Sequence, residues 1–140
     1  MSKFSEELVR VAKTQIGIRE IGGNNRGSMI VEYQKTTWLK PGAWPWCASF
    51  VTWCINEALK SKIVAKELGL KNATQIKNWR PRTASAWDFD NWAKERNLKV
   101  LTENDKALAG DIVTFDFSHI GIVIEDQIGD FIKTVEGNTN

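Results

Sequence analysis

Histidine and cysteine are scarce in this chain of 140 residues, which contains one histidine and two cysteines. A zinc hydrolase is excluded, because one histidine and two unsuitably spaced cysteines cannot supply a closed set of zinc ligands. Cys47 and Cys54, placed on one helix, would lie about 10 Å apart at a rise of ~1.5 Å per residue, which is too far for a disulfide. We therefore expect free thiols, as in proteins made in the cytoplasm, and neither a metal nor a cofactor.

Long apolar runs are also missing. No stretch approaches the roughly 18 residues that cross a bilayer, and residues 1–7 lack the order of charged, apolar and small residues found in a secretory signal. The net charge of +2 comes from 19 basic and 17 acidic residues that are mixed along the chain, so no large basic patch for nucleic acid is visible. We expect one monomeric domain over residues 1–140, made in the cytoplasm without a signal peptide, with no membrane insertion and no nucleic-acid partner.

Residues 44–54 combine a rigid turn with an apolar run that begins with a cysteine. Pro45 predicts a helix start, so Cys47 falls in the first turn, where unpaired N–H groups and the helix dipole favour a thiolate. Apolar residues at three- and four-residue spacing predict a core-facing helix; they are Phe50, Val51, Cys54, Ile55, Ala58 and Leu59. Cys47 is therefore a candidate nucleophile, although a lone cysteine is more often a small core hydrophobe.

Seven tryptophans are a high number for this length. Most such indoles build the core and its rim, but Trp44 and Trp46 flank Cys47 and are candidates for a substrate-binding groove. The segment 20–27 is dense in glycine and asparagine, which tolerate left-handed backbone. It predicts a structural turn near the rim of a cleft, where Asn24 is a candidate substrate contact.

The remaining helical patterns read as scaffold. Residues 5–16 predict a helix with Ser5 as N-cap and Gly17 as its end, and a second short helix follows the 20–27 turn. Residues 62–82 predict helical turns joined by loops, and a third helix capped by Thr83 or Ser85 ends at Asn97. The expected buried stripe of the first helix is Leu8, Val11, Ala12 and Ile16. The second helical pattern runs through Ile30, Val31 and Tyr33, and the candidates for the packed face of the third are Trp87, Trp92 and Ala93.

From residue 98 the pattern changes from helical to extended. Alternating β-branched and aromatic residues between turn signals predict strands at 99–101, 111–117, 119–125 and 130–136. Helices followed by strands predict an α+β fold, in which N-terminal helices pack on a C-terminal antiparallel sheet.

Pairing of the last two strands predicts a polar pair. Closing the hairpin across Glu125 and Asp130 places His119 directly opposite Glu136, where the Cβ atoms of opposed residues lie about 4.5–5.5 Å apart. A hydrogen bond between imidazole and carboxylate is then within reach, but a slip of one residue would break it. Gly121, on the same face, predicts close approach by another backbone, which we expect to be the end of the Cys47 helix.

Nucleophile, base and orienting group are the parts that covalent acyl transfer requires, and Cys47, His119 and Glu136 can supply them. Four segments, in this order and spacing, resemble the CHAP family, whose name stands for cysteine, histidine-dependent amidohydrolase/peptidase; they are residues 46–54, 110–115, 119–123 and 134–139. The resemblance implies a papain-like fold and hydrolysis of bacterial peptidoglycan, as in phage endolysins.

Carried over by position, the resemblance implies Cys47 as nucleophile, His119 as base, Glu136 as its orienting partner and Asn138 as a fourth polar site residue. Some endolysins of this family bind calcium through an acidic loop just before the cysteine, but residues 37–44 contain no carboxylate. Family members usually continue with another strand after the last motif, which is consistent with a domain cut from a longer protein with a separate wall-binding module.

We expect an endolysin catalytic domain that acts as an N-acetylmuramoyl-L-alanine amidase. Two alternatives stay open: an endopeptidase on stem or crossbridge peptides, and a non-catalytic wall-binding module that keeps the fold. Retention of all three catalytic residue types argues against the second.

Overall fold

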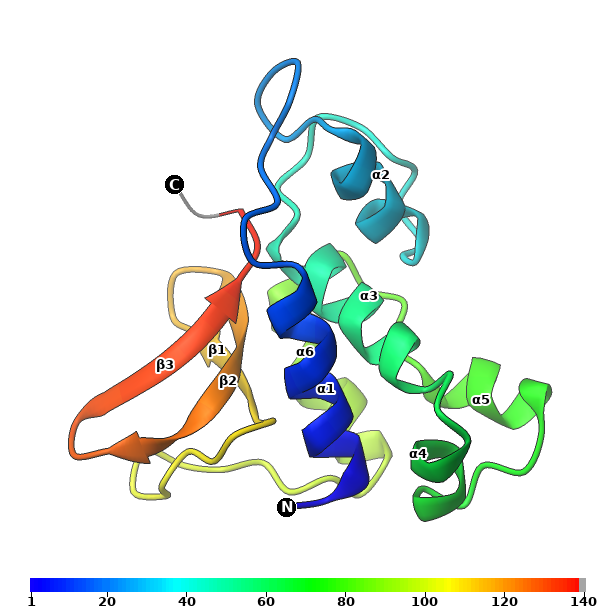
Figure 1. The fold of residues 1–140 in the computed structure, drawn as a ribbon, viewed down its shortest axis with the longest axis vertical. Coiled ribbons are helices and arrows are strands. Elements are labelled where there is room, and N and C mark those ends of the chain that lie inside the picture. The colour runs from blue at the N-terminus through cyan, green and yellow to red at the C-terminus, as the bar shows by residue number, and fades with distance from the viewer. Residues whose placement is uncertain (139–140) are drawn as a thin grey trace.

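The computed structural model describes residues 1–138 as helices followed by a small sheet (Figure 1). The elements, in chain order, are α1 Lys3–Thr14, α2 Ser28–Lys35, α3 Cys47–Ala58, α4 Lys62–Glu67, α5 Ala73–Trp79, the 3-10 helix η1 Ala86–Asp88, α6 Phe89–Glu95, β1 Ile112–Phe115, β2 His119–Ile128 and β3 Phe131–Glu136. The strands form an antiparallel sheet in the order β1-β2-β3. The predicted α+β fold is confirmed.

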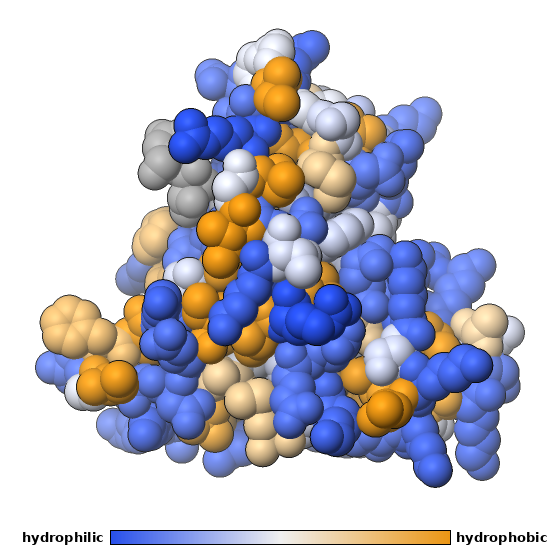
Figure 2. Space-filling view, in the orientation of Figure 1, coloured by the Kyte–Doolittle hydropathy of each residue, from blue (hydrophilic) through white to orange (hydrophobic). Residues whose placement is uncertain are grey.

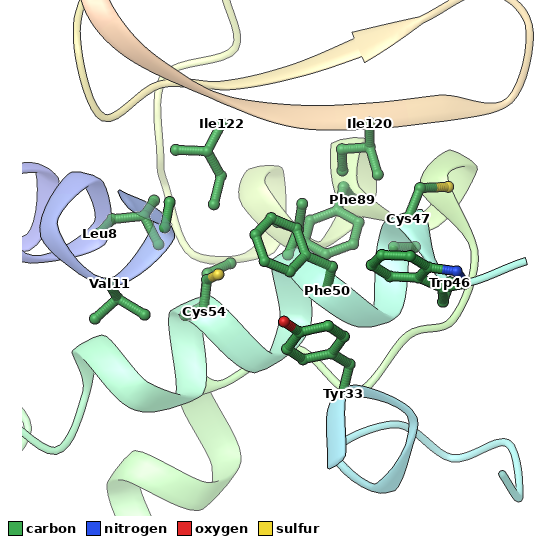
Figure 3. Packing of buried hydrophobic residues seen from close by; sticks show 14 of the residues in the cluster. Leu8, Val11, Tyr33, Trp46, Cys47, Phe50, Cys54, Phe89, Ile120 and Ile122 are labelled. Carbon is green, nitrogen blue, oxygen red and sulfur yellow. The ribbon is translucent and has the colours of Figure 1, made fainter. Parts of the chain in front are cut away.

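Helix α3 is the centre of the packing. It contacts α1, α2 and β2, and α1 also contacts β2, so the helices cover one face of the sheet (Figure 1). Figure 3 shows Ile120 and Ile122 of β2 pointing towards α3, with Ile122 on the side of Leu8 and Val11 of α1 and Ile120 on the side of Cys47. Each of these aliphatic side chains is buried, which stabilises the fold by about 1.5–3 kcal/mol apiece. The first strand of the β2–β3 hairpin is thereby fixed against the helix that begins at Cys47.

The predicted ends of the first helix are wrong. Ser2 is the N-cap, and its hydroxyl accepts a hydrogen bond from the backbone N–H of Ser5, so α1 begins before the expected cap. The helix ends at Thr14, which leaves Ile16 beyond it and 64% exposed, not on the buried stripe. The apolar spheres in the centre of Figure 2 gather over this segment after α1, which includes Ile16, Ile18 and Ile21.

Further expectations fail in the second half of the chain. Residues 99–101 do not form a strand, so the sheet described for residues 1–138 begins at β1. Trp87, expected on a packed face, is 62% exposed, because the chain there forms η1 before α6 begins. Trp92 is buried as predicted. The C-cap of α6 is Arg96 and not Asn97 as expected; Asn97 follows it in a left-handed conformation with φ of 57°.

The pairing of β2 with β3 differs from the predicted register by two residues. Gly121 lies opposite Glu136, where the predicted pairing placed His119. The turn is tighter than expected, because Gly129 adopts a left-handed φ of 56° and Ile128 already pairs with Phe131. Two irregularities in β2 absorb the extra residues. A shift of two residues keeps the same side chains on the same face, so His119 and Glu136 still share one.

No helix within residues 1–138 is both long enough and apolar enough to cross a membrane.

Candidate active site

Cys47 is the first residue of α3, as the proline signal predicts. The residue is only 7% exposed, and its thiol donates a hydrogen bond to the carbonyl oxygen of Ser118, with 3.9 Å between sulfur and oxygen. Ser118 has a left-handed φ of 60°, which is uncommon for a residue with a side chain. The backbone N–H of Ile120 also faces the sulfur. The residues on both sides of His119 therefore contact the nucleophile candidate.

The protonation state of Cys47 differs from the sequence-based expectation. Burial raises the pKa of the Cys47 thiol above its ordinary value, and this effect outweighs the backbone N–H groups of Ala48, Ile120 and Cys47 itself, which lower it. The charge of Glu136 adds a smaller increase. The helix start does stabilise the thiolate, but removal from water costs more, so the resting side chain is a thiol.

His119 and Glu136 form the hydrogen bond that the face-sharing argument predicts. The imidazole Nε2 lies 2.7 Å from Glu136 Oε1, and both side chains are largely buried. A carboxylate only accepts hydrogen bonds, so Nε2 carries the proton of this contact. The other ring nitrogen, Nδ1, remains for an exchange of protons with a second group.

Two glycines explain how the strand reaches the helix. A Cβ at Gly121 would lie 2.5 Å from Glu136 Cγ, so the close approach at this position is made by the glutamate side chain, not by the helix end as predicted. It is Gly137 that meets the helix: a Cβ there would lie 2.8 Å from Phe50 Cβ and 2.9 Å from the Trp46 ring. The chain after Glu136 therefore packs closely against the start of α3.

Trp46 is largely buried but also borders the cavity on the Glu136 side of the site, so its predicted role in substrate binding stays a prediction. It is 5% exposed, its ring stacks on Tyr33 with centroids 5.6 Å apart, and its indole N–H donates to Glu20 Oε1 over 3.0 Å. Figure 3 shows Trp46 beside Cys47 and above Tyr33, in the core. Trp46 therefore packs in the core directly beside Cys47, the nucleophile candidate. Sequence reasoning missed Glu20, and the only signal for it was its place at the start of the 20–27 turn.

The other two predicted contact residues lie at the surface. Trp44 is 47% exposed, and its indole N–H donates to the carbonyl oxygen of Lys40. Asn24 is exposed in the 20–27 turn, whose next residue, Asn25, reaches the carbonyl oxygen of Ala43 over 3.5 Å. The turn and the segment before Cys47 are thus neighbours, and the roles of Trp44 and Asn24 stay predictions.

Asn138 lies two residues after Glu136, half-buried and in a left-handed conformation with φ of 60°. Its predicted role as a polar site residue stays a prediction.

A cavity of about 330 Å³ lies beside this site, on the Glu136 side. It is bounded by the segment after α1, by the end of β3, and by Tyr33, Trp46 and Phe50 from the core. Within residues 1–138, no three His, Cys, Asp or Glu side chains are close enough together to hold a metal ion.

Comparison with known proteins gives one match. No curated protein and no solved structure matches the chain. The family described as CHAP domain matches residues 39–138, which include Cys47, His119 and Glu136. This match covers well over half of the sequence, so the chain belongs to the CHAP family of cysteine- and histidine-dependent amidohydrolases and peptidases, which act on peptidoglycan.

Proposed function

We propose that this chain is an N-acetylmuramoyl-L-alanine amidase domain of an endolysin, with Cys47 as nucleophile, His119 as base and Glu136 as the group that orients the base. The observation that carries the residue assignment is the 2.7 Å contact between His119 Nε2 and Glu136 Oε1, beside a thiol held by the residue before His119. His119 is also the only histidine of a histidine-dependent enzyme.

In the first half of the reaction, the Cys47 thiol gives its proton to His119 Nδ1 as the sulfur attacks the carbonyl carbon of the amide. The backbone N–H of Cys47, at the start of α3, has no partner within the helix and is available to the oxyanion. His119 Nδ1–H then protonates the leaving nitrogen, and the carbon–nitrogen bond breaks. A thioester of Cys47 and a free amine result.

In the second half, His119 removes a proton from water as the water oxygen attacks the thioester carbon. The carbon–sulfur bond breaks, the carboxylic acid product leaves, and the proton returns to the Cys47 sulfur. Glu136 accepts from Nε2–H throughout, so it stabilises the imidazolium that forms twice in each cycle. Burial raises the pKa of the Cys47 thiol, so the sulfur must transfer its proton to His119 as part of the attack.

Mass spectrometry of the fragments released from purified sacculi tests the proposed bond. An amidase releases peptides with a new amino terminus on L-alanine and leaves glycan strands without peptides. New amino termini inside the stem or crossbridge peptides would replace the amidase by an endopeptidase. Unchanged sacculi that nevertheless bind the protein would favour a non-catalytic wall-binding module.

We also propose that the enzyme is made in the cytoplasm and reaches the wall after release or delivery, because Cys47 and Cys54 are both free thiols, as is usual in cytoplasmic proteins. Fractionation of the producing cells, with an antibody against the chain, distinguishes this from export.

A further inference from the structure

Both oxygens of the Glu136 carboxylate are engaged. Oε1 accepts from His119 Nε2, and Oε2 accepts from the hydroxyl of Thr134. Thr134 lies two residues earlier on β3, so the two side chains stand on the same face of the sheet. The hydroxyl therefore holds the oxygen that the imidazole does not use, and it fixes the rotation of the carboxylate about its last bond.

The position opposite Glu136 supplies the space that its side chain needs. The residue opposite Glu136 is Gly121, and His119 is the diagonal neighbour of Glu136. Diagonal neighbours on paired strands lie about 7–8 Å apart, so only long side chains reach across. Glu136 must therefore lie across the position opposite it, which is Gly121. A Cβ at Gly121 would lie 2.5 Å from Glu136 Cγ, which is closer than real side chains come.

We propose that Thr134 and Gly121 are positioning residues that set Glu136 against His119, one by a hydrogen bond and the other by its missing side chain. The inference rests on the proposed roles of Cys47, His119 and Glu136. A glutamate side chain has several rotatable bonds, and ordering it costs free energy that these two contacts offset. With the carboxylate fixed, neutral His119 keeps its proton on Nε2 and presents the Nδ1 lone pair.

Removal of the Thr134 hydroxyl is the first test. We expect Thr134→Val to lower kcat on soluble peptidoglycan fragments by about 10- to 100-fold with little change in KM, since the lost hydrogen bond involves a charged group. Thr134→Ser should restore most of the activity, and Thr134→Ala should behave like Thr134→Val. The matched control is Thr114→Val, which removes an exposed hydroxyl from strand β1, on the other side of β2.

Nitrogen-15 NMR of the single histidine gives a readout that does not depend on substrate. In a Cys47→Ala background at a pH where the ring is neutral, we expect the proton on Nε2 when Thr134 is present or replaced by Ser. Thr134→Val should give a mixture of the two tautomers. Normal turnover by either variant without the hydroxyl, or an unchanged tautomer in Thr134→Val, would overturn the role of Thr134.

A double-mutant cycle tests Gly121. We expect Gly121→Ala to displace Glu136 and to lower kcat, but to add almost nothing to the loss already caused by Glu136→Gln. Additive losses would mean that the alanine damages the sheet in another way, and the role of Gly121 would be refuted.

Circular dichroism at the assay temperature shows that each variant is folded. Normal lysis by Cys47→Ala would refute the proposed function itself, which is a different outcome from normal turnover by Thr134→Val.

Discussion

The Cys47 thiol donates to the carbonyl oxygen of Ser118, 3.9 Å away, and Ser118 is the residue directly before His119. This contact joins the first residue of α3 to the turn that precedes β2, so nucleophile and base are placed by one backbone contact. A carbonyl oxygen accepts from a thiol but offers nothing to a thiolate. Together with burial, it favours a protonated sulfur in the resting enzyme.

Substitutions of the two cysteines should have different effects on lysis and on stability. We expect Cys47→Ser to abolish lysis of sacculi without loss of stability, measured by turbidity and by thermal unfolding. Cys54→Ser should keep lysis but destabilise the fold by about 1–3 kcal/mol, because Cys54 is fully buried and a hydroxyl there lacks a partner. Lysis by Cys47→Ser at the wild-type rate would remove the catalytic assignment.

Alkylation of Cys47 should be slow at neutral pH and accelerate in alkali. Thiolates react with iodoacetamide and thiols do not, and the raised pKa of Cys47 keeps the thiolate fraction small below the ordinary thiol value of about 8.5. We expect the rate, followed by mass spectrometry in a Cys54→Ala background, to rise about tenfold per pH unit from pH 7 up to the raised pKa. A rate that is already constant at pH 7 would indicate a thiolate at rest.

Stability should fall in alkali because of Cys54. Burial raises the pKa of the Cys54 thiol well above its ordinary value, so the folded chain keeps a proton that the unfolded chain loses. The contribution of this group is complete below about pH 8.5 and decreases above it, by about 1.4 kcal/mol per pH unit until the raised pKa is reached. Burial also raises the pKa of Tyr33, which acts in the same direction at higher pH.

Urea unfolding between pH 7 and 10 measures this effect. Cys54→Ala should show a shallower decrease in the free energy of unfolding than the wild type, whereas Cys47→Ala should retain the share that Cys54 contributes. Parallel curves for the wild type and Cys54→Ala would contradict the expected role of burial.

Glu136→Gln should lower the turnover rate by about 10²- to 10⁴-fold, as loss of a third triad member does elsewhere, with little change in melting temperature. The measurement is the rate of fragment release at saturating substrate. Glu125→Gln is the matched control, because Glu125 is an exposed residue of β2 whose ion pair with Lys133 lies away from His119. Equal rates for Glu136→Gln and the control would mean that another residue orients the base.

The sequence predicts the His119–Glu136 contact correctly even though the predicted strand register is wrong. The predicted and observed registers differ by two residues, and an even shift leaves every side chain on its own face. The irregularities of β2 are invisible to a pattern of alternating residues, because they change the pairing without changing which residues are apolar. The helix at Cys47 was predictable from proline and from apolar spacing, which are both local signals.

Features that depend on tertiary contacts were not predictable. Ile16 and Trp87 continue an apolar pattern but lie where the helix has ended or has not begun, and helix ends are the least reliable part of a periodic signal. Trp46 is drawn into the core by its stack on Tyr33 and its hydrogen bond to Glu20, and both partners are distant in sequence. The thiol pKa likewise depends on burial, which a helix dipole argument leaves out.

The β2–β3 hairpin has its polar pair at one end and its turn at the other. Nine residue steps separate His119 from Ile128, so the turn at Gly129 is about 30 Å along the strand from the imidazole at ~3.3 Å per residue. Exposed loop tips of this kind tolerate inserted segments. A targeting peptide placed between Gly129 and Asp130 should leave lysis of sacculi intact. The tip of the hairpin would then present a peptide that binds a chosen bacterial surface.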